Sequence, residues 1–233
     1  MVIFLFAISS HKLISFGYPN VLALKRIGPH DYDVLGQIIW SLLGDAWLDR
    51  IPTKKGFSYR FQLDQGDGPN TEYIYWLTRF FYERGYCASP IPNRIVIKVP
   101  ACDRTGPKTR ITYRLTLFTF TSFGWIYNAF YRNGIKVVPV MISDYLTPIT
   151  LAALIMQDGS RQNSGVHIAT NCFTYKECLF IADLLANTFY LQTSVISAGV
   201  PNQWRVSIWK GSMPLLRSII GPHMIGQMAR KIA

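Results

Sequence analysis

Acidic residues are scarce in this chain. Its 233 residues include 13 Asp and Glu against 24 Lys and Arg, which leaves a formal net charge of +11. Charged residues make up only 16% of the sequence, so the imbalance is more informative than the amount of charge. It indicates a polyanionic partner, and nucleic acid fits best because 14% of the residues are aromatic and can stack on bases. A merely basic soluble protein and a protein that touches anionic lipid are the alternatives.

Cysteine and histidine are also few, with four of each. The cysteines show no Cys-x-x-Cys spacing and the histidines are scattered, which excludes a zinc-binding arrangement. We expect buried free thiols in a reducing compartment at Cys87, Cys102, Cys172 and Cys178.

Long apolar runs are missing. The N-terminal run Val2–Ile8 is too short to span a bilayer, and Lys12 follows it rather than preceding it. The run is expected to be a packed or frayed N-terminal extension; the remnant of a targeting segment and a leader from an upstream exon are the alternatives. No other stretch reaches transmembrane length without charge, so we expect no stable membrane insertion.

Several catalytic motifs are absent as well. The sequence has no Gly-rich phosphate loop followed by Lys-Ser/Thr, which argues against ATP use, and no pattern of a serine or cysteine nucleophile triad. The segment DQGDG (64–68) has a slight likeness to a calcium-binding loop, but its acidic spacing is wrong and its twelfth position, Tyr75, is no ligand.

The order of elements predicted for the first part of the chain begins with an apolar segment of helical length, 35–48, that has an acidic end. Room for a short strand follows, then an alternating strand at 57–64, where Phe57, Tyr59, Phe61 and Leu63 share one face. Asn70–Thr71 caps a helix that stops at Gly85. Two alternating strands and a short helix complete this half, at 93–99, 110–117 and about 123–131.

The same order returns in the second part. Pro148 suits the start of an apolar helix at 148–158, and a plausible Thr174 cap opens a helix that ends near Tyr190. Strands are predicted near 165–171, 192–197 and 203–209, and a final helix at 212–220. We expect an α+β fold of two similar halves: an N-terminal extension 1–29, a first half 30–131, a linker 132–147 and a second half 148–233.

Asp45 and Asp158 occupy equivalent places, each at the end of an apolar helix and beside a glycine. A carboxylate is unfavourable at the negative end of a helix dipole. If the two helices pack about a pseudo-twofold axis, both carboxylates converge, and their repulsion favours a bound Mg²⁺ ion. Two unrelated turn aspartates are the alternative.

The segments IIWSLLGDA (38–46) and LAALIMQDG (151–159) resemble the two motif copies that name the LAGLIDADG family. The flanking segments 145–160 and 171–185 resemble intron-encoded single-chain members, and the similarity runs from about residue 30 to the C-terminus. In that family the motif helices form the interface between two half-domains, and each half contributes a four-stranded antiparallel sheet to a saddle over DNA. Small residues here would permit close helix contact: Ser41, Gly44, Ala152 and Ala153. Gln157, where many relatives carry an acid, and Ala46, in place of glycine, depart from the motif.

The resemblance also implies the site residues. Asp45 and Asp158 would be the catalytic metal ligands for Mg²⁺, or for Mn²⁺ in its place, with the backbones of Gly44 and Gln157 beside them. Lys136 and Lys231 resemble the lysines that family members place near each active centre, although 91 residues separate Asp45 from Lys136 and 73 separate Asp158 from Lys231. Two solvated surface lysines are the alternative.

Polar, basic and amide side chains recur on one face of several predicted strands. Such side chains read base edges and grip phosphates, whereas a solvated sheet face usually carries Asp and Glu. The predicted DNA-binding residues are Arg60, Gln62, Arg94, Lys98, Arg110, Thr112, Arg114, His167, Asn171, Gln203 and Arg205.

The sequence therefore predicts a monomeric homing endonuclease that makes metal-dependent double-strand breaks in duplex DNA and promotes intron mobility. The resemblance places it in an organelle, with the mitochondrion ahead of the chloroplast. The alternative is a group I intron maturase, an RNA-binding splicing cofactor, and one chain could serve both roles. Two retained aspartates favour the nuclease, because a pure RNA binder has no chemical need for converging carboxylates.

Overall fold

The computed structural model describes residues 21–26, 28–99 and 108–233. The apolar run Val2–Ile8 and Cys102 lie outside these residues. Of the other three cysteines, Cys87 and Cys178 are buried free thiols as expected, but Cys172 is exposed. None of the described helices is long and apolar enough to cross a membrane.

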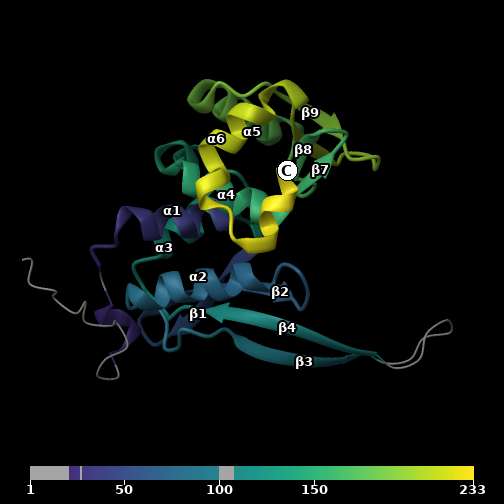
Figure 1. Cartoon of the computed structure of the whole chain (residues 1–233). Coiled ribbons are helices and arrows are strands. Elements are labelled where there is room, and N and C mark those ends of the chain that lie inside the picture. The colour runs from purple at the N-terminus through teal and green to yellow at the C-terminus, as the bar shows by residue number, and fades with distance from the viewer. Residues whose placement is uncertain (1–20, 27, 100–107) are drawn as a thin grey trace, which may run out of the picture.

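Two four-stranded antiparallel sheets form the frame of the molecule (Figure 1). The first has the order β1-β2-β4-β3 and the second the order β7-β8-β10-β9, so the same topology occurs twice. The first half consists of α1 (Tyr32–Ser41), β1 (Ala46–Thr53), β2 (Gly56–Gly66), α2 (Thr71–Glu83), β3 (Asn93–Val99), β4 (Lys108–Thr116) and α3 (Gly124–Phe130). The second consists of α4 (Pro148–Asp158), β7 (Gly159–Gln162), β8 (Gly165–Ala169), α5 (Tyr175–Phe189), β9 (Thr193–Ser197), β10 (Trp204–Ile208) and α6 (Met213–Ile220). The expected α+β fold is confirmed.

The sequence reasoning was wrong about the end of the first apolar helix. Helix α1 ends at Ser41, residues 42–45 form a turn, and Ala46 begins β1, which pairs with β2 from Ala46↔Leu63 onward. Pairing with the alternating strand β2 outweighs the helical length of the apolar run, because tertiary context overrides local propensity. Asp45 therefore lies in the turn between helix and strand, whereas Asp158 is the last residue of α4.

Helices α1 and α4 lie together between the two sheet-bearing halves (Figure 1). Ser41, Ala152 and Ala153 are fully buried there. Gly36, which the sequence analysis did not single out, also allows a close approach: a Cβ atom on it would lie 3.1 Å from Cγ2 of Thr150. Small side chains let the backbones of two helices approach, so this contact fixes how the ends of α1 and α4 meet.

The connection between the halves is itself folded. It contains the hairpin β5 (Tyr131–Arg132) and β6 (Ile135–Lys136) and the 3-10 helix η2 (Val140–Tyr145). The Trp40 indole N–H donates to the carbonyl of Ile142 over 3.2 Å, which anchors η2 to α1. After α6 the chain continues through the 3-10 helices η4 (Gly221–His223) and η5 (Gly226–Lys231), and η5 lies against both α2 and β7. The C-terminal segment thus contacts both halves.

Candidate active site and nucleic-acid interface

Asp45 and Asp158 meet where α1 and α4 end. A Cβ atom on Gly44 would lie only 2.8 Å from Oδ2 of Asp158, so the Asp158 carboxylate lies against the backbone next to Asp45. Asp158 is half-buried and Asp45 is exposed, and each carboxylate senses the charges of Lys231 and Lys136. The convergence expected from the repeated motif is thus present in the geometry.

Burial and mutual repulsion set the protonation of this pair. Asp45 is exposed as a residue, but neighbouring protein atoms partly desolvate its carboxyl group and raise its pKa, against the opposing charges of Lys231 and Lys136. Burial, followed by repulsion from Asp45, raises the pKa of the Asp158 carboxyl to about 7, although the same two lysines oppose the shift. The charged forms of both carboxylates are thus disfavoured in spite of the two lysines, and a bound divalent cation would stabilise them.

Lys136 and Lys231 approach the two motif ends in the same manner. Nζ of Lys136 donates to the carbonyl of Ala46 over 2.8 Å and, at 3.4 Å, to that of Gly44. Nζ of Lys231 donates to the carbonyls of Met156, at 2.6 Å, and Gln157, at 3.2 Å. Lys136 therefore binds the carbonyl groups on either side of Asp45, and Lys231 binds those of the two residues before Asp158. Burial lowers the pKa of both ammonium groups. The strands and connections of the first half are longer, so the two lysines lie at different sequence distances from their aspartates. For this reason the sequence did not show that the lysines are equivalent.

The Gln157 side chain organises the centre from inside, a role that the sequence did not reveal. Its Oε1 accepts from the backbone N–H of Asp45 at 3.0 Å. Its Nε2 donates to Ser41 Oγ at 3.0 Å and to the hydroxyl of Tyr73 at 2.8 Å. Gln157 is 8% exposed and Tyr73 is fully buried, so these bonds have little competition from water. Gly44 occupies the equivalent position in the other half, and its missing side chain leaves the space that Gln157 fills.

The donor set suits a hard divalent cation. Two carboxylates with raised pKa lie beside the backbone carbonyls of Gly44 and Gln157, and Mg²⁺ prefers oxygen ligands. Over the described part of the chain, no cluster of three or more His, Cys, Asp and Glu occurs, which argues against a zinc-type centre. A carbonyl oxygen has two lone pairs, so the Lys136 and Lys231 contacts leave one available at each backbone group.

The raised pKa of Asp158 predicts a pH-dependent cost to folding in the absence of metal. A carboxyl whose folded pKa, about 7, lies above its ordinary value of 3.8 binds its proton more tightly in the folded state. Its unfavourable contribution is therefore absent at low pH, grows as the pH rises between these values, and is complete above 7. We expect Asp158→Asn to raise Tm by a few degrees at pH 8 with chelator and by almost nothing near pH 4. Differential scanning fluorimetry across this range checks the result; an equal Tm for both proteins at every pH would contradict it.

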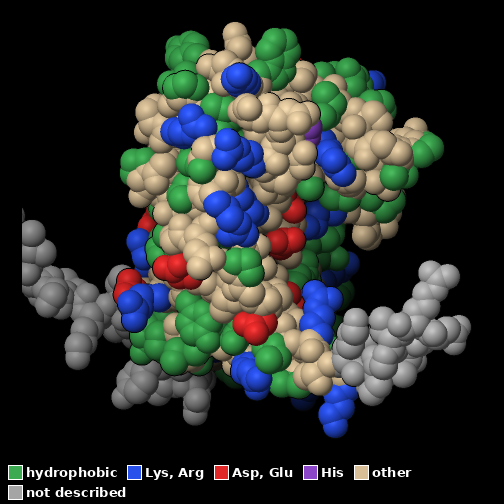
Figure 2. Space-filling view, turned by 45° about the vertical axis from the view of Figure 1, so that its right-hand side comes forward, with side chains coloured by type: hydrophobic (Ala, Val, Ile, Leu, Met, Phe, Trp, Pro, Cys, Tyr) green, Lys and Arg blue, Asp and Glu red, His purple; other side chains and the backbone are tan. Residues whose placement is uncertain are grey.

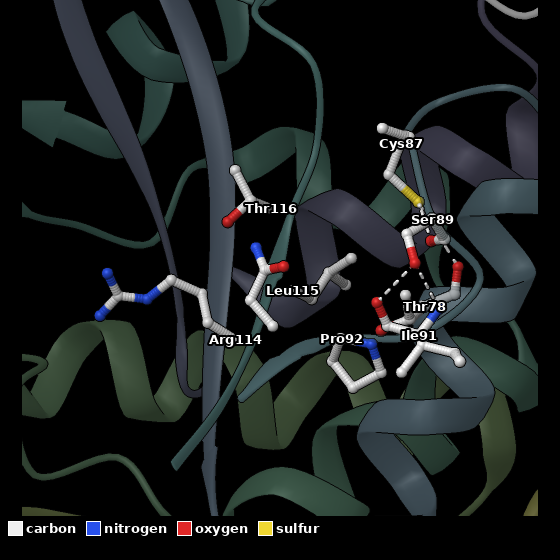
Figure 3. A pocket seen from close by; sticks show the side chains of 10 residues that line it. Thr78, Cys87, Ser89, Ile91, Pro92, Arg114, Leu115 and Thr116 are labelled. Atoms are coloured by element: carbon white, nitrogen blue, oxygen red, sulfur yellow. Dashed lines mark hydrogen bonds between the residues drawn. The ribbon is translucent and has the colours of Figure 1, made fainter. Parts of the chain in front are cut away.

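The outer face of the first sheet carries arginines that are already paired with acids. Both guanidinium-to-carboxylate pairs lie across neighbouring strands, Arg60 with Asp49 at 3.0 Å and Arg114 with Asp64 at 2.7 Å. Gln62 also donates to Asp49. Arg114 also lines a small pocket with Cys87 and Ile91, and its guanidinium group extends to the opposite side of β4 from Leu115 (Figure 3). This face therefore presents oriented guanidinium groups rather than freely moving ones.

The strand register decides which predicted residues share this face. Arg114 pairs with Asp64, Thr112 with Gly66 and Arg110 with Ile97, so Arg110, Thr112 and Arg114 lie on it together. Thr112 is 5% exposed, however, and its hydroxyl has no hydrogen-bond partner among the described residues. Arg94 and Lys98 pair with Tyr113 and Thr109 and lie on the other face. The alternation within β3 shows that Arg94 and Lys98 share a face. It could not show that this face is opposite to that of the β4 residues, because the pairing of the two strands decides this.

The outer face of the second sheet lacks acids altogether. Val166, Ile168, Val206 and Ile208 are fully buried and define the inner face. The register places His167 opposite Ser207, and Arg205 opposite Ala169, on the outer face. Asn171 and Gln203 lie just beyond β8 and β10, where the Asn171 amide donates to Oε1 of Gln203 at 2.9 Å. Within the described part of the chain, Arg205 forms no ion pair of the kind that holds the arginines of the first sheet.

Comparisons with known proteins agree with this geometry. The profile described as "LAGLIDADG DNA endonuclease family" matches residues 36–216. The chain is 37% identical over 154 residues to the "intron-encoded endonuclease ai4" of Dictyostelium discoideum, which covers 66% of this chain and 96% of that protein. It is 34% identical over 217 residues to the "cytochrome b mRNA maturase bI2" of Saccharomyces cerevisiae, which covers 89% of this chain but only 49% of the yeast protein. This chain thus spans about half of that relative.

The fold also matches a solved structure. The homing endonuclease I-WcaI, solved bound to its DNA recognition sequence, superposes with a TM-score of 0.69 over 90% of this chain and 96% of that one, at 20% sequence identity. At this identity the match supports the arrangement of elements and says nothing about individual site residues.

Proposed function

The chain belongs to the LAGLIDADG DNA endonuclease family, and on that premise we propose that it is a site-specific homing endonuclease. It would bind a long DNA duplex across the outer faces of both sheets and cut both strands at the end of α1 and α4. Because one chain carries two motif ends and two sheets, it would act as a monomer. We place it in an organelle, with the mitochondrion ahead of the chloroplast. There the double-strand break that it makes would promote intron mobility.

The observation that supports this proposal most is the meeting of Asp45 and Asp158, each with its own lysine. Desolvation raises the pKa of both carboxyls and repulsion from Asp45 adds to the shift of Asp158, and the backbone carbonyls of Gly44 and Gln157 add oxygen ligands beside them. A protein that only bound RNA would have no chemical use for two converging carboxylates, which disfavour each other's charged forms.

In the proposed mechanism, Asp45 and Asp158 would hold Mg²⁺, or Mn²⁺ in its place, with the carbonyls of Gly44 and Gln157 nearby. Such ions supply a Lewis acid and lower the pKa of bound water. Lys136 and Lys231 would stabilise negative charge that develops on the phosphate of each strand. Gln157 would keep the Asp45 backbone in place through the bond to its N–H.

The test begins with the target. A plasmid library with a randomised duplex segment, together with the intronless exon junction of the host gene, is incubated with protein in Mg²⁺ or in chelator. We expect Mg²⁺-dependent linear product, cut at one long sequence and with staggered ends. No cleavage of any duplex in Mg²⁺ or Mn²⁺ would contradict the proposal.

Binding to the duplex should depend strongly on salt. Each neutralised phosphate releases condensed counterions, so a footprint of roughly 6–10 phosphates gives a slope of about −5 to −9 in log K against log salt. Fluorescence anisotropy in Ca²⁺, which permits binding without cutting, measures this slope between low and physiological salt. A slope near zero on the selected duplex would remove the sheet faces from the interface.

A maturase is the alternative, and the yeast relative named a cytochrome b mRNA maturase favours it. Its basic surface would then bind group I intron RNA. The two activities separate in one experiment: a protein that binds the exon junction without cutting it, yet promotes splicing of the intron, is a maturase. Cleavage together with splicing would establish both roles.

A further inference from the structure

A pocket of about 350 Å³ lies beside Lys231, where the first residues of β7 meet the C-terminal segment. Its lining residues are Gly159, Ser160, Arg161, Arg230 and Lys231. Three of the five carry positive charge and none carries a carboxyl group. Since Gly159 directly follows Asp158, the pocket adjoins the candidate active site of the second half only.

Arg230 is held in place at this pocket. Its Nη1 donates to the carbonyl of Gln227 at 2.8 Å, and its Nη2 donates to Oδ1 of Asn70 at 2.6 Å. A guanidinium group has five N–H donors, so these two bonds fix its orientation and leave donors for a ligand. Neither bond neutralises its charge, because both acceptors are uncharged.

Among the described residues of the first half, the positions equivalent to the two arginines of this pocket carry no positive charge. Arg161 lies three residues after Asp158, and the residue three after Asp45 is Leu48, which is buried. Arg230 directly precedes Lys231, and the residue before Lys136 is Ile135, an apolar side chain that is 67% exposed. The two halves therefore share the lysine and the aspartate but differ in the two arginines beside them.

Acids elsewhere do not offset these charges. The second half, 148–233, contains Asp158, Glu177 and Asp183 as its only acidic residues. In the space-filling view, Lys and Arg side chains follow one another down the upper part of the molecule, and the visible acidic side chains gather lower, toward the first sheet (Figure 2). The acids that lie near the pocket are Asp158 and Asp45 of the candidate centre, which interact with Lys231, and Glu72 of α2, which lies against Gly226 at the start of η5. The two arginines are therefore the groups that would attract an anion to the pocket.

We propose that Arg161, Arg230 and Lys231 form a binding site for one backbone phosphate next to the bond cut on the second-half side, and that the other strand has no equivalent site. Planar guanidinium groups bind phosphate oxygens through charge-assisted hydrogen bonds, which are stronger than neutral ones. The inference rests on the proposed function. Its consequence is that the protein grips one strand more firmly than the other beside the cut.

The experiment uses the selected duplex with single methylphosphonate groups, which remove the charge of one phosphate at a time, near both cuts. Affinity is measured in Ca²⁺ for the wild-type protein and for Arg161→Gln/Arg230→Gln. The control, Arg79→Gln/Lys176→Gln, removes the same charge at exposed positions of α2 and α5. A further variant, Arg230→Lys, retains charge without the guanidinium fork.

We expect one methylphosphonate, on one strand only, to weaken wild-type binding roughly tenfold. The same substitution should have little further effect on Arg161→Gln/Arg230→Gln and its full effect on the control, while Arg230→Lys should recover part of the wild-type affinity. Equal effects on all proteins, or matching effects on both strands, would overturn the pocket proposal while DNA cleavage by the wild type still upheld the proposed function. If the wild type binds no duplex, both proposals fail together.

Discussion

Replacing either converging carboxylate is expected to stop DNA cleavage and spare DNA binding. Asp45→Asn and Asp158→Asn preserve side-chain size but remove the charge that would hold a divalent ion at the centre. We expect each to slow cleavage by about a hundredfold or more, since loss of one group that stabilises transition-state charge costs about this much. Affinity for the duplex should stay the same or rise, because a negative charge near the phosphates is lost.

The measurement resolves the two strands. Duplex labelled at each 5′ end is mixed with each variant in Mg²⁺, and nicking is followed strand by strand. Unequal loss on the two strands is expected, because only Asp45 has its backbone held by Gln157. Asp183→Asn, which makes the same charge change at an exposed site on α5, serves as control. Wild-type rates on both strands for either active-site variant would contradict the assignment of that residue.

Enlarging Gly44 is expected to have the second large effect, on stability and on cleavage together. A Cβ atom there would lie 2.6 Å from Oε1 of Gln157 and 2.8 Å from Oδ2 of Asp158, distances that force both side chains to move. We expect Gly44→Val to lower the free energy of unfolding by about 1–3 kcal/mol, as overpacking of a close interface does. Cleavage should fall in parallel, because the bond between Gln157 and Asp45 depends on the same space.

Gly221 serves as a control glycine, which distinguishes a packing effect at Gly44 from the general effect of replacing a glycine. At Gly221 an added Cβ meets nothing within 4 Å, and its backbone is helical, with φ −50° and ψ −45°. Gly221→Ala should therefore leave stability within about 0.5 kcal/mol of wild type. Urea unfolding of both variants measures the difference. A Gly44→Val protein as stable and as active as the Gly221→Ala protein would show that the close approach at the motif ends is unimportant.

Much of this arrangement could be predicted because periodic patterns are local. The alternation at 57–64 and the cap at Thr174 correspond to β2 and to the start of α5, where Thr174 accepts from the backbone N–H of Glu177. The duplicated order of elements indicated two similar halves before any contact was known. Both aspartates could be selected from the repeat, because each ends an apolar segment beside a glycine at the same place in the two copies.

Features that depend on distant pairing could not be predicted. Residues 46–48 continue an apolar run, and only their partners in β2 make them a strand. The face of Arg94 and Lys98 depends on their register with β4. The Gln157 contacts join residues 84 to 116 positions apart, so no local pattern reports them. Gln157 had seemed only a departure from the motif, yet the structure makes it the centre of a buried hydrogen-bond network.

Cleavage of supercoiled plasmid by the double variant Asp45→Asn/Asp158→Asn tests the central claim most directly. The plasmid carries the selected target, and wild-type and variant proteins are incubated in Mg²⁺ or chelator, with nicked and linear product scored on gels. The account predicts linear product from the wild type in Mg²⁺ only, and neither nicked nor linear product from the variant, although it binds the target. Full double-strand cutting by the double variant would contradict a mechanism based on these two carboxylates.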